Sequence, residues 1–124
     1  MADARRRADH PLARVLADVG AHSCPGELNF HCHTTCSDGS LRPEQLADQA
    51  IELGLAHLAV TDHHSTAAIA PLQQALWERN QSGFRVPMLW SGMEISCLLD
   101  GCLVHVLALG FELDHPDLVP YNQG

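Results

Sequence analysis

The sequence predicts an α/β protein with parallel strands, and two features of the chain carry that prediction. Short apolar runs alternate with segments of helical hydrophobic spacing, in the order strand, helix, strand, helix, strand. Histidines and carboxylates follow the ends of successive apolar runs, which is where parallel α/β proteins build their sites. At 124 residues the chain has room for one domain at most.

The chain is acidic, with 7 Lys+Arg against 15 Asp+Glu and a formal net charge of −8. All of its basic residues are Arg. This balance argues against a stable or nonspecific nucleic-acid binder, although bound cations would still allow a phosphorylated substrate. A hydrophobic fraction of 46% argues against disorder. The unusual count is nine His, the side chain that most often ligates metals in proteins.

The N-terminal segment has no apolar run of signal-peptide length, and no stretch is long enough to span a membrane. We therefore expect a soluble, cytoplasmic protein without a membrane partner. Five cysteines and no secretory signal make a disulfide framework unexpected. A structural zinc site built from Cys24, Cys32, Cys36 and a His is an alternative, but the usual Cys-x-x-Cys spacing is absent.

In the N-terminal half we expect a helix over 9–19, a linker over 21–26, a strand over 27–33, a turn-rich loop over 34–40 and a helix over 43–53. Asp9 is placed to cap the first helix and Gly20 to end it. Leu28 and Phe30 alternate with polar residues, as in a strand. Gly54 stands where the C-cap of the second helix belongs. The segment before residue 27 is a short helical leader.

In the C-terminal half we expect a strand over 55–61, a helix over 67–81, a strand over 86–91, a hairpin of strands over 95–99 and 103–109, and a loop-like tail over 114–124. Pro71 would delay or kink the helix. Asp100-Gly101 is a strong hairpin-turn signal. The chain thus divides into a leader and linker over 1–26 and a single domain over 27–124.

Ligand-type side chains stand at the ends of three predicted strands: His31 and His33, Asp62 and His63, and Glu94. A spacing of two residues places His31 and His33 on the same face of a strand, where both imidazoles can hold one ion. Cys32 then points to the opposite face. Because the carboxyl ends of parallel strands converge, these side chains are expected to lie close together.

Two further residues, Asp38 and His105, and the surroundings of Glu94 complete the pattern. Asp38 lies in the following loop, close enough to curl back over the same edge. Glu94 follows Gly92, which would let the backbone come close, and a carboxylate there can bridge two metal ions about 3.5–4 Å apart. His105 lies between Val104 and Val106 and faces the side that they do not.

Each residue has an ordinary structural explanation when it is taken alone. A His-x-His pair occurs by chance, an Asp in Ser-Asp-Gly commonly forms a turn, and Asp62 is placed to cap the following helix. His105 alone would read as a packed core residue. The joint placement of these side chains at three strand ends favours metal binding as the shared explanation.

The motif residues resemble those of a known family. Phe30-His31-Cys32-His33-Thr34 with Ser37-Asp38-Gly39 resembles the first motif of the PHP (polymerase and histidinol phosphatase) domain. Its second, third and fourth motifs are similar to residues 54–63, 92–95 and 104–110. The match runs from about Asn29 to Gly110 and looks most like the stand-alone, TrpH-type phosphoesterases. The residues at 62–64 and 89–92 are similar to those of cyanobacterial members.

The resemblance implies the N-terminal half of a distorted barrel of seven β/α units, a (β/α)7 barrel, that holds up to three divalent ions of manganese, iron or zinc. By motif position the implied metal ligands are His31, His33, Asp38, His63, Glu94 and His105. A metal-activated hydroxide would attack phosphorus, with Asp38 and His63 as catalytic residues that also contact the substrate. The implied activity is hydrolysis of a small phosphate ester, of the nucleoside bisphosphate or short oligonucleotide class or histidinol phosphate.

The sequence departs from the family pattern at two places. His64 replaces the Asp or Asn that often follows Thr61-Asp62-His63, and the family's later ligand motifs have no counterpart before Gly124. An incomplete domain that binds metal without turnover is therefore the alternative, and the open strand edges of a half barrel would make it depend on a partner. A PHP domain that serves a DNA polymerase fits the acidic charge poorly. The remaining histidines, His10, His22, His57 and His115, match no motif.

Overall fold

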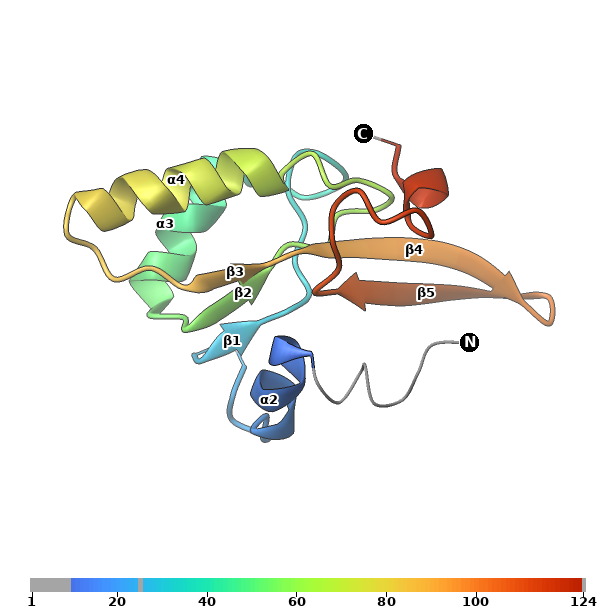
Figure 1. The fold of residues 1–124 in the computed structure, drawn as a ribbon, viewed down its shortest axis with the longest axis horizontal. Helices are drawn as coiled ribbons and strands as arrows, with labels where there is room; N and C mark the ends of the chain where they lie inside the picture. Colours follow the sequence, from blue (N-terminus) through green and yellow to red (C-terminus); the bar gives the residue numbers. More distant parts are fainter. Residues whose placement is uncertain (1–9, 25, 124) are drawn as a thin grey trace.

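The computed structural model describes residues 10–24 and 26–123 and has a mixed α/β fold (Figure 1). In chain order its elements are α2 (Pro11–Ala17), β1 (Leu28–Asn29), α3 (Pro43–Leu53), β2 (His57–Ala59), α4 (Ile69–Gln81), β3 (Met88–Trp90), β4 (Gly92–Leu99), β5 (Cys102–Leu109) and a 3₁₀ turn (Val119–Tyr121).

The strands form two sheets. Strands β1, β2 and β3 pair in parallel in that order, with Leu28 opposite His57 and Leu58 opposite Leu89. Strands β4 and β5 form an antiparallel hairpin that extends away from the three-stranded sheet (Figure 1). The prediction of an α/β protein with parallel strands is confirmed for these three strands.

Helices α3 and α4 pack together over one face of the parallel sheet, and α2 lies beside β1 (Figure 1). The core between them is apolar, because each helix buries the side chains that recur at helical spacing. Leu46 of α3, Leu58 of β2 and Leu72 of α4 meet in it. Arg79 of α4 forms a two-pronged ion pair with Asp48 of α3, which ties the outer faces of the two helices together.

Two predicted element boundaries prove accurate. Helix α3 spans Pro43–Leu53 as expected, and Gly54 adopts a left-handed φ of 71° at its C-cap. The hairpin turn is also confirmed, since Asp100 and Gly101 have φ values of 51° and 79°, both in the region that a type I′ turn needs. In each case a local residue preference decides the boundary.

Two predicted boundaries bearing on the site are wrong. The first strand covers only Leu28–Asn29, because the Asn29 carboxamide captures the backbone N–H of His31 and ends the regular pairing. Glu94, expected just past a strand, lies inside β4, which begins at Gly92. The reason is tertiary: residues 92–94 pair with β5 on one side and with residues 62–64 on the other.

The ends of the described chain also differ from expectation. Helix α2 is shorter than predicted and is capped by His10, whose Nδ1 accepts a hydrogen bond from the N–H of Leu12. Asp9, the expected cap, lies outside the described residues. The tail is not all loop, since Val119–Tyr121 forms a 3₁₀ turn.

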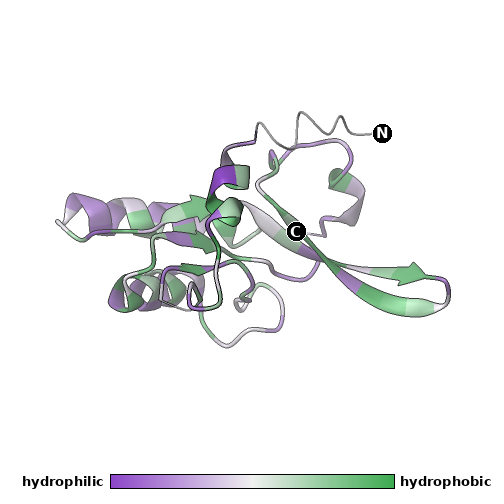
Figure 2. Ribbon diagram, turned by 90° about the horizontal axis from the view of Figure 1, so that it is seen from below, coloured by the Kyte–Doolittle hydropathy of each residue, from purple (hydrophilic) through white to green (hydrophobic). Residues whose placement is uncertain are grey.

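The outer part of the hairpin is apolar and is green in Figure 2. Leu98 and Leu103, near its tip, are largely exposed. Among residues 10–24 and 26–123, no helix has both the length and the apolar character to cross a bilayer.

We expect Leu72→Ala to lower the free energy of unfolding by about 2–5 kcal/mol, because Leu72 is fully buried between α4 and the sheet. The matched control is Leu53→Ala at the exposed end of α3, which should change it by less than about 1 kcal/mol. Urea unfolding followed by circular dichroism measures both. Equal losses for the two variants would contradict the assigned core.

Candidate metal centre

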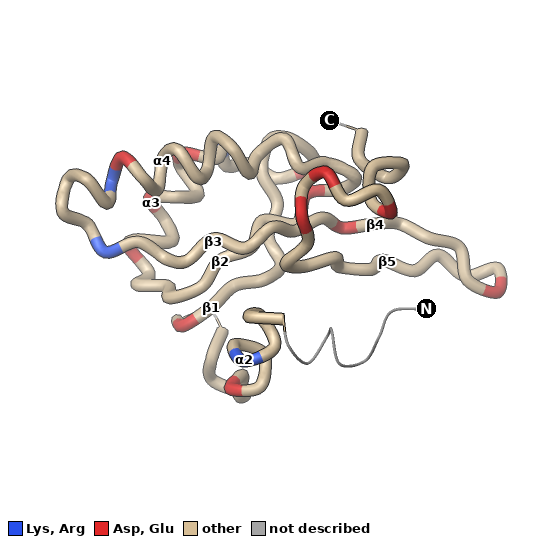
Figure 3. The backbone as a smooth tube through the Cα atoms, viewed as in Figure 1, with Lys and Arg blue, Asp and Glu red and all other residues tan. Residues whose placement is uncertain are grey.

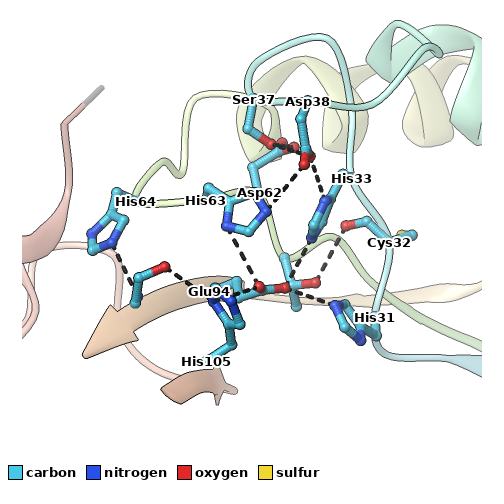
Figure 4. Close-up of polar contacts among 12 residues, drawn as sticks. His31, Cys32, His33, Ser37, Asp38, Asp62, His63, His64, Glu94 and His105 are labelled. Carbon is cyan, nitrogen blue, oxygen red and sulfur yellow. Dashed lines mark hydrogen bonds and ion pairs between the residues drawn. The ribbon is translucent and has the colours of Figure 1, made fainter. Parts of the chain in front are cut away.

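The carboxylate of Glu94 is the centre of a cluster of imidazoles. Its side chain is only 5% exposed, yet four histidines reach it (Figure 4). His31 Nε2 lies 2.7 Å and His33 Nε2 lies 3.0 Å from Oε1 of Glu94. On the other side, His63 Nδ1 lies 3.5 Å and His105 Nδ1 lies 3.3 Å from Oε2. The two carboxylate oxygens therefore divide the imidazoles into two pairs, an arrangement that suits a bridging carboxylate.

A second carboxylate, that of Asp38, faces two of the same imidazoles. His33 Nδ1 lies 2.5 Å from Oδ1 of Asp38, and His63 Nε2 lies 3.2 Å from Oδ2. His33 and His63 thus each stand between Asp38 and Glu94. A histidine that binds a metal through one ring nitrogen commonly gives the other to a carboxylate, so both rings have the orientation that a metal ligand needs.

Titration of the cluster reflects these contacts. Partial burial lowers the pKa of His33, but its hydrogen bonds with Glu94 and Asp38 outweigh burial and raise the pKa above its usual 6.5. Burial raises the pKa of Glu94, while hydrogen bonds with His31 and His33 hold it below the ordinary value. Desolvation raises the pKa of Asp38, but its hydrogen bond with His33 and the nearby charges of His33 and His63 together hold the pKa below the ordinary value. Both carboxylates are thus kept in the anionic form that attracts cations.

His31 and His33 reach the cluster from the extended segment that follows β1. Alternation along this segment sends their rings to the same side, and the intervening Cys32 points to the other, where its thiol donates to the carbonyl oxygen of Ala59 at 3.3 Å. Burial and the nearby charge of Asp62 raise the pKa of the Cys32 thiol to about 12. The predicted orientations of these three side chains are confirmed.

Asp62 anchors the loop that carries Asp38. Its buried carboxylate accepts hydrogen bonds from the N–H of Thr34 at 2.6 Å, the hydroxyl of Thr34 at 2.7 Å and the hydroxyl of Ser37 at 2.6 Å. The expectation that Asp62 joins the ligand-type side chains, or else caps the following helix, is wrong on both counts. Its oxygens are saturated by the loop, a pairing across 25 or more residues that local spacing does not reveal.

Two glycines allow the segments of the site to touch. A Cβ at Gly92 would lie 2.5 Å from the carbonyl oxygen of Val60, so only glycine lets β4 approach the chain after β2. A Cβ at Gly39 would lie 2.5 Å from the carbonyl carbon and oxygen of His33. The close approach predicted for Gly92 is confirmed, and Gly39 has the same role in folding the Asp38 loop back onto His33.

The described residues contain three overlapping groups able to hold a metal ion: His31, His33 and Glu94; His33, Asp38 and His63; and His63, Glu94 and His105. Together these groups contain all six residues predicted as ligands. None of the groups found in residues 10–24 and 26–123 includes a cysteine, and Cys24 and Cys36 are exposed. Imidazole nitrogens and carboxylate oxygens fit divalent ions such as manganese, iron or zinc.

The surrounding charge also favours a cation. Acidic segments lie along β4, at the hairpin tip and in the loop after β5, whereas the visible blue segments lie on α2 and around the C-terminal end of α4 (Figure 3). The ion pairs of Glu94 and Asp38 are with histidines, and none is with an arginine among the described residues. In this part of the chain, no arginine therefore competes with a metal ion for the two carboxylates.

The comparison with protein families agrees with this donor set. The PHP domain model matches residues 29–111, the stretch that contains every residue of the cluster. The chain belongs to the PHP domain family. Its length within that family is short: it spans 29% of the 5'-3' exoribonuclease Rnm of Escherichia coli, to which it is 40% identical over 71% of its own residues.

Two further PHP relatives come from Chromobacterium violaceum. The chain is 33% identical to a 3',5'-nucleoside bisphosphate phosphatase, over 73% of this chain and 30% of that one. It also matches the structure of an amidohydrolase with bound sulfate at a TM-score of 0.66 and 30% identity, over 76% of this chain and 31% of that one. A protein of Bifidobacterium adolescentis assigned as a metal-dependent phosphoesterase matches with a TM-score of 0.65 and 32% identity.

The histidines outside the PHP motifs have other partners. His10 Nε2 lies 2.6 Å from the carbonyl oxygen of Gly110, and His57 Nδ1 accepts a hydrogen bond from the indole of Trp90. His115 accepts a hydrogen bond from the N–H of Asp117. None of these belongs to a metal-competent group among the described residues. The residue that sequence reasoning left undecided, His64, borders the cluster through β4.

We expect Gly92→Ala to disturb the PHP site more than the fold, because the new methyl group meets the Val60 carbonyl and must push β4 and Glu94 outward. Bound metal should fall at least about tenfold at equal protein concentration, in keeping with the loss of ligand placement. The matched control is Gly20→Ala, where a Cβ meets nothing within 4 Å. Metal analysis after gel filtration measures the effect, and full metal binding by Gly92→Ala would contradict the assigned approach.

The raised pKa of Cys32 predicts slow alkylation. At pH 8 a thiol with a pKa of about 12 is ionised to about one part in 10⁴, so Cys32 should stay unmodified while the exposed Cys24 and Cys36 react. Mass spectrometry after iodoacetamide treatment, with and without a chelator, reads out each cysteine. Faster modification of Cys24 and Cys36 after chelation would instead support a structural zinc site.

Proposed function

We propose that this chain carries the metal-binding part of a phosphoesterase that hydrolyses a phosphate ester of the nucleoside bisphosphate or short oligonucleotide class. The observation that carries the proposal is the convergence of four imidazoles on Glu94, with a second carboxylate, Asp38, facing two of them. The relatives support the chemistry: one acts as a 5'-3' exoribonuclease, one as a 3',5'-nucleoside bisphosphate phosphatase, and one structure holds sulfate, an oxyanion shaped like phosphate.

In this proposal His31, His33, Asp38, His63, Glu94 and His105 hold two or three divalent ions of manganese, iron or zinc. Such ions supply a Lewis acid that lowers the pKa of water and neutralises charge on a phosphate group. Each oxygen of Glu94 faces its own pair of imidazoles and can serve a separate ion. Glu94 would then be the ligand that two of the ions share.

Asp38 and His63 are the residues we assign to substrate contact. The Asp38 side chain is 63% exposed and lies on the solvent side of the cluster. Its contact with His63 Nε2 orients that ring and places an acid–base pair beside the ions, where a leaving group needs a proton. The other carboxylate, Glu94, is buried and therefore serves the ions alone.

The acidic surface is consistent with this assignment. An anionic substrate would be repelled by a chain with a net charge of −8 unless cations filled the site first. The bound ions would then make the cluster attractive to phosphate. The partner we propose is accordingly a small phosphorylated molecule.

The remaining architecture belongs to the same proposal. We take residues 1–26 as a leader and 27–124 as the N-terminal portion of a distorted (β/α)7 barrel. The chain spans about 30% of its relatives, and β1 and β3 are the outer strands of the parallel sheet. Pairing along those edges would continue the barrel. An incomplete centre that holds metal without turnover is the second candidate, favoured by the short coverage.

The test combines metal content with phosphate release. The purified chain, loaded with Mn²⁺, should bind metal and release phosphate from adenosine 3',5'-bisphosphate. Glu94→Gln should lower metal affinity by more than about 100-fold, beyond the 10–100-fold typical of residues that only support ligands. Glu112→Gln, the same change at an exposed position, is the matched control.

The outcomes separate the candidates. Metal binding with phosphate release supports the phosphoesterase, and metal binding without release of phosphate supports the second candidate. Wild-type protein that binds no metal, or equal metal affinity for Glu94→Gln and Glu112→Gln, would overturn both.

A further inference from the structure

His64 joins three segments of the chain at the border of the metal centre. Its backbone N–H donates to the carbonyl oxygen of Glu94 at 3.0 Å, and its own carbonyl oxygen accepts from the N–H of Gln123 at 2.6 Å. Its ring continues the link, since Nε2 accepts from the N–H of Ser96 at 3.1 Å and Nδ1 lies 3.0 Å from the carbonyl oxygen of Tyr121 (Figure 4).

These contacts define which nitrogen carries the proton. A backbone N–H can only donate, so Nε2 of His64 must be unprotonated where it meets Ser96. A carbonyl oxygen can only accept, so the proton must be on Nδ1 where it meets Tyr121. One neutral tautomer satisfies both partners, and the ring acts as a rigid bridge between β4 and the C-terminal segment.

The backbone of His64 is held in an uncommon conformation. Its φ of 47° lies in the left-handed region, which residues other than glycine seldom adopt. Such a conformation persists only where surrounding contacts over-determine it, and the four contacts of His64 do so. The left-handed backbone of His64 sets the direction of the chain after His63.

The Ser96 end of this bridge leads to a proposed ligand. Ser96 lies opposite His105 across the hairpin, and its hydroxyl lies 3.1 Å from His105 Nδ1. It also stands two residues from Glu94, on the same face of β4. Fixing the Ser96 backbone therefore fixes the strand on which Glu94 sits and the side chain that orients His105.

The other end is held by residues 118–123, which we name the C-terminal strap. Besides its contacts with His64, the strap is pinned at Asn122, whose Oδ1 accepts from the N–H of Thr66 at 3.3 Å. Asn122 Nδ2 donates to the Thr66 hydroxyl at 2.7 Å. The strap lies outside the stretch matched by the PHP model. It is bonded to His64 and Thr66, which follow His63 in the chain.

We propose that His64 is a positioning residue of the metal centre. It locks β4, with Glu94 and with Ser96, the partner of His105, to the segment that carries His63, and the C-terminal strap holds it in that role. His64 joins no metal-competent group of the described residues, so we do not assign it as a ligand. This inference rests on the proposed metal site. It adds His64 and the C-terminal strap to the contacts that hold the ligand-bearing segments in place.

The test is a Mn²⁺ titration of the full chain followed by electron paramagnetic resonance. His64→Asn tolerates the left-handed backbone and keeps a donor near Tyr121, but it is too short to reach the Ser96 N–H. We expect it to weaken Mn²⁺ binding about tenfold or more, as removal of a ligand-orienting contact does. His64→Gln, whose longer amide restores an acceptor for Ser96, should recover affinity to within about threefold of the wild type.

His115→Asn is the matched control: the same change, in the tail, at a histidine whose ring bonds only to a neighbouring backbone group. It should leave Mn²⁺ affinity unchanged. Wild-type protein without Mn²⁺ binding would overturn the proposed function itself. Normal wild-type binding with equal affinity for His64→Asn would overturn only the positioning role.

A measurement on the unaltered protein guards against loss of folding in the variants. Long-range ¹H–¹⁵N spectra should show the His64 ring neutral with its proton on Nδ1. A proton on Nε2 would overturn the bridge. Asn122→Ala, which frees the strap from Thr66 without touching His64, should broaden the Mn²⁺ spectrum in the same direction as His64→Asn. An unchanged spectrum would overturn the part assigned to the strap.

Discussion

The buried carboxylate of Glu94 is the constraint on which the rest of this structure depends. A carboxylate that is 5% exposed loses most of its hydration. Four imidazoles from three separate segments of the chain take the place of the lost water. To bring them there, β4 must pass against the chain after β2, which only the missing side chain of Gly92 permits. The fold positions β4, and β4 positions Glu94.

Two aspartates of neighbouring motifs have different roles in the site. Asp62 is buried and accepts three hydrogen bonds from Thr34 and Ser37, so its charge is used to hold a loop. Asp38, carried by that loop, is exposed, and its carboxylate contacts His33 and His63. The same chemical group is thus a scaffold in one environment and a candidate ligand in the other, and burial with saturated oxygens is what separates the two roles.

Order in the centre comes from both sides of β4. One side is the hairpin partner β5, which presents His105, and the other is the turn at His63 and His64 with the C-terminal strap behind it. A metal centre built on extended segments and loops needs such support, because ligand placement must hold to about half an ångström. The chain belongs to the PHP family, and its phosphoesterase relatives support the reaction proposed for the centre.

Sequence patterns alone were sufficient for the α/β class, for helix α3 with its Gly54 cap and for the Asp100-Gly101 turn, because each follows from residue preferences within a few positions. The strand-end pattern also pointed to the residues of the cluster, together with Asp62, and the resemblance to the PHP motifs reduced them to the six that meet there. Only the tertiary structure decided that Glu94 lies within a strand, that Asp62 holds a loop instead of facing the histidines, and that His64 bridges β4 to the tail. Those outcomes depend on partners in other segments of the chain, and the sequence pattern does not show which distant hydrogen-bonding group will lie within reach.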